Sequence, residues 1–85
     1  MMDKLSVKAL STGVGVAWGL CMLILGCLAR HGWGTLAVSV MSSVYAGFRP
    51  TYAGAILGAA WGFIDGAILG AVIALVYNAV ASREN

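Results

Sequence analysis

Charged residues are scarce in this chain of 85 residues, which contains five Lys or Arg and three Asp or Glu. So few charges cannot form the basic patch on which nucleic-acid binding depends, and we expect no nucleic-acid partner. The net charge of +2 comes from a few Lys and Arg near the ends of apolar segments. This is the usual placement of cations beside membrane-spanning helices.

Residues that bind metals or perform catalysis are also few. The chain has one histidine, His31, and two cysteines, Cys21 and Cys27, and these do not form a cluster with metal-ligand spacing. We find no nucleophile–base pair and no phosphate-binding loop in the sequence. We therefore expect no metal, no cofactor and no enzymatic activity.

Two long apolar runs dominate the sequence instead. Residues 9–29 contain no charge, and residues 51–82 contain a single one. Each run exceeds the roughly 20 residues that a membrane-spanning helix needs, and a soluble domain of this size could not bury both. The sequence predicts a single all-α membrane domain over residues 1–85, with spanning helices over about 6–29 and about 52–80.

The segment between the two predicted spans is bounded by Gly34 and by Pro50, which disfavours helix at the residue before it. The segment from Trp33 to Phe48 would measure about 24 Å as a helix, less than the hydrocarbon layer of about 30 Å, and the middle helix is expected over about residues 34–48. Such a helix is too short to cross the bilayer comfortably. We expect a shorter amphipathic or re-entrant helix that joins the two spans.

Hydroxyl groups follow one face of this middle segment. Thr35, Ser39 and Ser42 recur at helical spacing, opposite Leu36 and Val40. The pattern is typical of a weakly amphipathic helix that lies in the membrane interface or packs half-way into the protein. The alternative is a third span whose hydroxyl groups line a polar path.

Glycines recur at every fourth residue of the second predicted span, at Gly54, Gly58, Gly62, Gly66 and Gly70. Small residues let neighbouring spanning helices approach closely, so the pattern predicts Gly-zipper packing. Four residues turn a straight helix by about 400°, and the stripe therefore drifts around the helix. We expect residues 54–62 and 66–70 to meet two different helices. One partner would be the first span, through Gly15 and Gly19, and the other a second copy of the chain. The alternative is a monomeric hairpin whose spare glycines face lipid.

Asp65 lies within a few residues of the centre of the second predicted span. An ionised carboxylate at this depth costs at least about 2.5 to 3.5 kcal/mol, so we expect Asp65 to face a helix contact. In an antiparallel hairpin Trp18 lies at the same depth, and Trp61 lies one turn before Asp65. Their indole N–H groups are candidate donors to the carboxylate. Three roles stay open for Asp65: an inter-helix hydrogen bond, a cation or proton path, and binding to another membrane protein.

Five short blocks carry a family resemblance, namely Lys4-Leu5-Ser6-Val7-Lys8-Ala9-Leu10, Trp18-Gly19-Leu20, Gly32-Trp33-Gly34, Trp61-Gly62-Phe63-Ile64-Asp65-Gly66 and Leu75-Val76-Tyr77-Asn78. With these blocks the chain resembles a family of very small bacterial and archaeal integral membrane proteins that is commonly labelled bacteriophage holin. Holins accumulate in the membrane and open lesions that release a lytic enzyme. The resemblance implies a location in a bacterial or archaeal cytoplasmic membrane.

The sequence as a whole predicts a holin-like or channel-like homo-oligomer in the lipid bilayer. In this hypothesis Asp65, Thr35, Ser39 and Ser42 face a polar interior. The rival hypothesis is a non-catalytic accessory subunit that packs its glycine stripe against a larger membrane complex.

Overall fold

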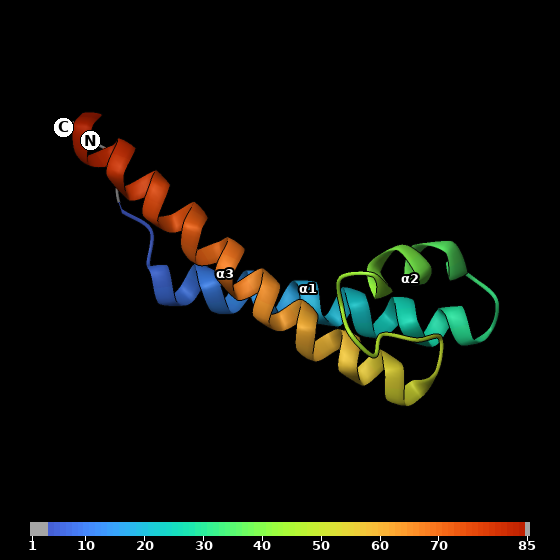
Figure 1. The fold of residues 1–85 in the computed structure, drawn as a ribbon. Coiled ribbons are helices and arrows are strands. Elements are labelled where there is room, and N and C mark those ends of the chain that lie inside the picture. Colours follow the sequence, from blue (N-terminus) through green and yellow to red (C-terminus); the bar gives the residue numbers. More distant parts are fainter. Residues whose placement is uncertain (1–3, 85) are drawn as a thin grey trace.

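The computed structural model describes residues 4–84, and every regular element within that range is a helix. The elements are α1 (Val7–Arg30), α2 (Thr35–Ser42) and α3 (Tyr52–Glu84). The two long helices α1 and α3 form an antiparallel hairpin, and α2 lies at its connected end (Figure 1). The predicted all-α class is confirmed for the described residues.

Local interactions explain where the two long helices begin and end. The Ser6 hydroxyl accepts a hydrogen bond from the Ala9 amide and caps the start of α1. The Thr51 hydroxyl does the same at the start of α3, where it accepts from the Gly54 amide. Beyond the end of α1, Gly32 and Gly34 adopt φ values of +92° and +74°, a conformation that glycine tolerates far better than other residues. The chain can therefore reverse its direction there.

Both long helices expose most of their apolar surface. α1 and the Tyr52–Arg83 part of α3 are long and apolar enough to cross a membrane. Only 28% of the most apolar stretch of α1, and 22% of that of α3, is buried within the chain. The core helix of a soluble protein would be mostly buried. These two candidate spans support the membrane-protein class.

The C-terminal part of the α3 glycine stripe, Gly62, Gly66 and Gly70, faces α1. A Cβ atom on Gly66 would lie 2.7 Å from the Val14 carbonyl oxygen and 2.9 Å from the Gly15 Cα atom. One on Gly70 would lie 2.7 Å from the Leu10 carbonyl oxygen. Any side chain at these positions would therefore displace the α1 backbone.

Gly62, Gly15 and Gly19 complete this contact. Gly62 lies against Gly19 and Met22 of α1. In the reverse direction, Cβ atoms on Gly15 and Gly19 would lie 2.8 Å and 2.9 Å from carbonyl oxygens of α3. The two backbones thus touch along the middle of the hairpin.

The N-terminal part of the stripe, Gly54 and Gly58, faces the connection between α2 and α3. A Cβ atom on Gly54 would lie 2.6 Å from the Arg49 carbonyl oxygen, and one on Gly58 would overlap the Phe48 ring. The expected division of the stripe between two contacts is therefore present, but it falls between Gly58 and Gly62, and both partners belong to the same chain. The second contact is thus made by the connection of the same chain and not by a second helix, and association with another copy stays a prediction.

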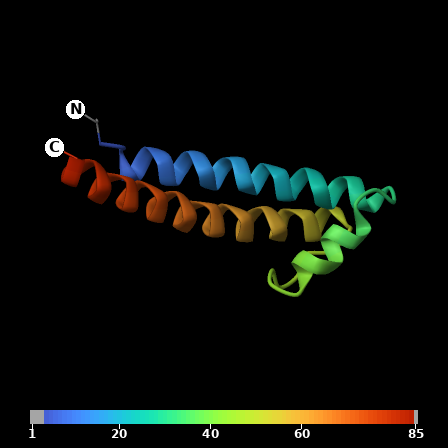
Figure 2. The same ribbon diagram turned by 90° about the horizontal axis from the view of Figure 1, so that it is seen from above.

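The crossing of the two helices explains why α1 meets three successive glycines. Rows of residues spaced by four run at about 26° to a helix axis, so a partner that crosses at an angle can follow such a row. Figure 1 shows α1 and α3 crossing, and the perpendicular view in Figure 2 shows them side by side along their length. The glycine stripe still drifts around α3, but α1 crosses α3 at an angle and follows the drift. The stripe therefore does not leave the α1 contact, as it would beside a parallel partner.

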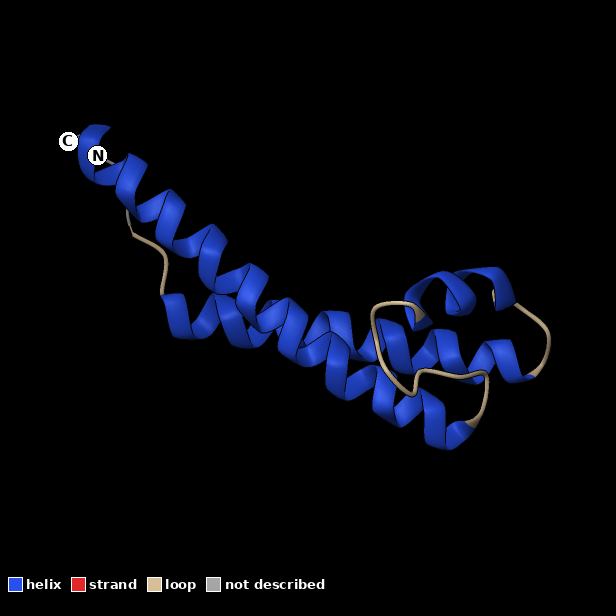
Figure 3. Cartoon of the chain, viewed as in Figure 1, coloured by secondary structure: helices blue, strands red, loops and turns tan. Residues whose placement is uncertain are grey.

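α2 contains eight residues, and the expected middle helix over 34–48 is therefore too long. Residues 43–51 instead form an irregular connection that returns to the start of α3 (Figure 3). Gly47 lies beyond the end of α2 and has a φ value of +86°, which excludes a continuous helix up to residue 48. An eight-residue helix extends about 12 Å, so α2 is not the third span that the sequence left open.

α2 and the connection pack onto the second half of α1 through one buried cluster. Its members are Met22, Ala29, Val38, Tyr45 and Phe48. The face of α2 that is buried therefore carries Val38. The hydroxyl face and the opposite face with Leu36 and Val40 are both exposed.

Polar contacts close the open end of the hairpin. The Asn78 side chain accepts a hydrogen bond of 2.7 Å from the Leu5 amide and donates one of 2.9 Å to the Leu5 carbonyl oxygen. The Ser11 hydroxyl donates to the Ala67 carbonyl oxygen over 2.7 Å. These contacts fix the register of α1 against α3.

Replacing Gly66 with Leu tests the backbone contact. We expect Gly66→Leu to lower the free energy of unfolding by about 1 to 3 kcal/mol or more, because the new side chain must push α1 away. Gly13→Leu is the matched control, since nothing lies within 4 Å of a Cβ atom there. Thermal or denaturant unfolding in mild detergent, followed by circular dichroism, measures both. Equal destabilisation by the two substitutions would contradict the contact.

Candidate functional site around Asp65

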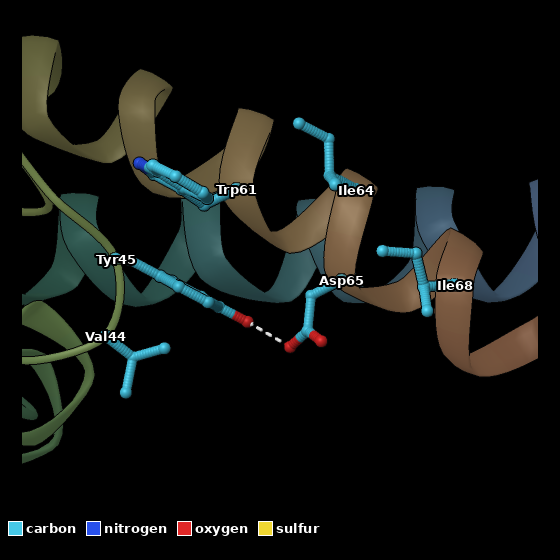
Figure 4. Close-up of a pocket in the computed structure, with 6 residues that line it drawn as sticks. All are labelled: Val44, Tyr45, Trp61, Ile64, Asp65 and Ile68. Atoms are coloured by element: carbon cyan, nitrogen blue, oxygen red, sulfur yellow. Dashed lines mark hydrogen bonds between the residues drawn. The ribbon is translucent and has the colours of Figure 1, made fainter.

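A chain of hydrogen bonds joins three segments at the middle of the hairpin. The Tyr45 hydroxyl, from the α2–α3 connection, donates to Oδ2 of Asp65 on α3 over 2.6 Å (Figure 4). The same hydroxyl accepts a hydrogen bond of 2.9 Å from Nε1 of Trp18 on α1. Tyr45 therefore connects both long helices, and its hydroxyl group is satisfied as donor and as acceptor.

Trp61 fixes the connection beside Tyr45. The two rings are stacked, with centroids 6.3 Å apart and planes inclined by 7°. Trp61 Nε1 also donates a hydrogen bond of 2.8 Å to the Ala46 carbonyl oxygen. Both contacts hold the Tyr45 ring and the neighbouring backbone against α3.

Tyr45 and Phe48 are the most deeply buried large side chains of the described residues, at 2% and 1% exposure. Tyr45 lies in the connection, outside both candidate spans. Burial, and after it the hydrogen bond to Asp65, raises the pKa of Tyr45 above its ordinary value of 10.0. The shift favours the neutral phenol, the form that donates to Asp65.

The structure corrects the expected donors to Asp65. Trp18 and Trp61 each have one indole N–H, and these groups donate to Tyr45 and Ala46 respectively. Trp18 thus reaches Asp65 through Tyr45, whereas Trp61 supports Tyr45 by stacking. Asp65 itself does not face the α1 contact that was expected for it, since it is exposed beside the connection.

Tyr45 is the site residue that sequence reasoning missed. Residues 34–48 were assigned to one helix, and the hydroxyl groups considered there were those of Ser and Thr. A signal was nevertheless available. Tyr45 and Phe48 are two large aromatic residues in a segment bounded by glycines and proline, and such residues are candidates for packing against the neighbouring helices.

Thr35, Ser39 and Ser42 do not join Asp65. All three are exposed on α2, and the Ser42 hydroxyl donates to the Ser39 carbonyl oxygen within the same helix. The pocket beside Asp65 is lined by Val44, Tyr45, Trp61, Ile64, Asp65 and Ile68. The expected polar face of the middle segment thus contributes no side chain to this pocket, because α2 ends before it.

The surroundings of the Asp65 carboxylate are apolar. Figure 4 shows Val44, Ile64 and Ile68 around the carboxylate and the Tyr45 hydroxyl. These three side chains are 68%, 53% and 60% exposed. The Asp65 carboxylate therefore lies on the outer surface of the hairpin, in a pocket with three aliphatic side chains in its lining.

Removing the Tyr45 hydroxyl tests the hydrogen-bond chain. We expect Tyr45→Phe to destabilise the fold by about 1.5 to 3 kcal/mol, because a bond to a charged acceptor is lost and the Trp18 N–H loses its partner. A double-mutant cycle with Asp65→Ala, which removes the acceptor, measures the coupling, and Tyr52→Phe is the control at an exposed ring. Strictly additive effects of Tyr45→Phe and Asp65→Ala would contradict the bond.

Comparison with known proteins gives no match: no family model, curated protein or solved structure shows significant similarity to the chain. The resemblance to the holin-labelled family therefore stays a prediction from the short sequence blocks. The geometry around Asp65 is the basis for a functional hypothesis.

Proposed function

We propose that the chain is an integral membrane protein in which α1 and α3 span the bilayer. The charged side chains of the described helices and connections support this arrangement. Lys4, Lys8 and Arg83 lie towards one end of the hairpin, and Arg30 and Arg49 lie towards the other. Between the two ends the long helices carry Asp65 as their single charged side chain. Cations at both ends of an apolar hairpin are typical of spanning helices.

In this membrane orientation, α2 and the connection form a re-entrant hairpin that reaches mid-depth. α2 turns back from the end of α1, and Tyr45 then contacts Trp18, which lies near the middle of the 24 residues of α1. Irregular backbone at membrane depth must be buried in protein or line a hydrated cavity. Tyr45 and Phe48 are buried, and Trp61 donates to the Ala46 carbonyl oxygen. Val44 and Ala46 are exposed, so in this proposal their side of the connection faces a hydrated path or a neighbouring chain.

The exposed carboxylate of Asp65 carries the functional proposal. A carboxylate that faces hydrocarbon at mid-depth costs at least about 2.5 to 3.5 kcal/mol, and side chains of this type usually face another protein or a hydrated cavity. The glycine stripe is occupied within the chain. Association with further chains therefore uses the face around Asp65, not the stripe.

We infer a holin-like or channel-like homo-oligomer in which the Asp65 faces of several copies surround a polar path. Symmetric assembly brings the same residue of every copy to the axis, so the carboxylates form a ring. Rings of Asp or Glu favour cations in channels. The path thus conducts small cations or protons across a bacterial or archaeal cytoplasmic membrane.

An accessory subunit of a larger membrane complex is the second candidate. The observation that favours it is the same exposed carboxylate, because a Lys or Arg of a different membrane protein would satisfy Asp65 equally well. The two candidates differ in what the purified chain does alone.

Ion flux through liposomes that contain only the purified chain tests the proposal. We expect a cation-selective flux that falls by about tenfold in Asp65→Asn, because the ring loses its charge, and that persists in Asp65→Glu. Subunit number is measured in parallel by native mass spectrometry from lipid nanodiscs. A single copy per nanodisc without flux contradicts the channel and favours the accessory subunit.

A further inference from the structure

We propose that the pocket beside Asp65 binds a small organic monocation, an ammonium group with apolar substituents. This inference rests on the proposed function in one respect, the position of Asp65 inside the membrane, and extends it by naming the class of ligand. The pocket has a volume of about 200 Å³ and opens on the surface of the hairpin (Figure 4).

Charge complementarity selects a cation. Asp65 is the one charged side chain among the six that line the pocket. Its Oδ2 atom accepts the hydrogen bond from Tyr45, and Figure 4 shows the second carboxylate oxygen directed away from Tyr45. This second oxygen is open to a ligand. An anion at the same place would be repelled by the carboxylate.

The remaining lining favours an organic cation over a metal ion. Metal cations are held by about six oxygen ligands, or by rings of carbonyl groups. Here the side chains supply the carboxylate and one phenol oxygen, and the Trp61 N–H is already bonded to Ala46. Within residues 4–84, no group of three or more His, Cys, Asp or Glu could hold a metal ion.

The aromatic and aliphatic side chains suit an alkylated ammonium group. Trp61, which is 39% exposed, presents an aromatic ring to the pocket, whereas the Tyr45 ring is buried and stacked on Trp61. Aromatic rings attract quaternary ammonium groups through their π faces, and the attraction grows when water is excluded. Val44, Ile64 and Ile68 provide apolar contacts for the substituents.

The pocket is open on one side. Val44, Ile64 and Ile68 are more than half exposed, and in the proposed assembly they belong to the face that surrounds the polar path. A cation therefore reaches Asp65 from that path.

Titration of the full-length chain in lipid nanodiscs with benzyltrimethylammonium tests the inference. Isothermal titration calorimetry gives the affinity, and tryptophan fluorescence reports Trp61 at the site. Neopentylbenzene, the neutral isostere with carbon in place of nitrogen, is the matched control on the unaltered protein. We expect it to bind at least about tenfold more weakly. Asp65→Asn is expected to weaken binding of the cation at least about tenfold, and Asp65→Glu less than about threefold.

Equal affinity for the cation and its neutral isostere would overturn the inference, and this comparison needs no altered protein. Full displacement of the probe by sodium at the same concentration would also overturn it, as would a failure to bind because a second copy covers the pocket. Binding that depends on Asp65 in a chain without ion flux contradicts the proposed channel alone. Flux that depends on Asp65 without binding of the probe contradicts the present inference alone.

Discussion

The close approach of the α1 and α3 backbones is the constraint on which the rest of the structure depends. It requires residues without side chains on both helices, and Gly15, Gly19 and Gly66 provide them at the centre. In the proposed membrane location, lipid tails offer no hydrophobic driving force for association between helices, so contacts of this kind carry the stability of the hairpin. The same contact sets Trp18 on α1 and Asp65 on α3 at nearly the same level.

Gly54 and Gly58, at the start of α3, position the connection between α2 and α3 and not α1. Gly58 leaves the space that the Phe48 ring occupies, and Phe48 in turn anchors the connection between α2 and α3. This anchor holds Tyr45 where its hydroxyl can bond to Trp18 and Asp65. A single stripe of small residues therefore positions both the second helix and the polar site.

Periodicity and composition were sufficient to predict the all-α class and the two long apolar helices. The antiparallel hairpin followed only if the middle segment did not span the membrane. Periodicity and composition could not predict the partner of each glycine, because that depends on the crossing of α1 and α3, which the one-dimensional pattern does not contain. Nor could they predict Tyr45 as the link to Asp65. The position of that side chain is set by the irregular connection of residues 43–51 and by its packing on Trp61.

The central claim is that the glycine stripe is satisfied within one chain. It is tested most directly by ¹³C–¹³C dipolar recoupling in lipid bilayers between the Cα atoms of Gly15 and Gly66, whose backbones touch in the structure. The labelled protein is diluted into an excess of unlabelled protein, so that contacts between different chains disappear. We predict that the cross-peak keeps its intensity per labelled chain. A cross-peak that vanishes on dilution, or that is absent throughout, would contradict the account.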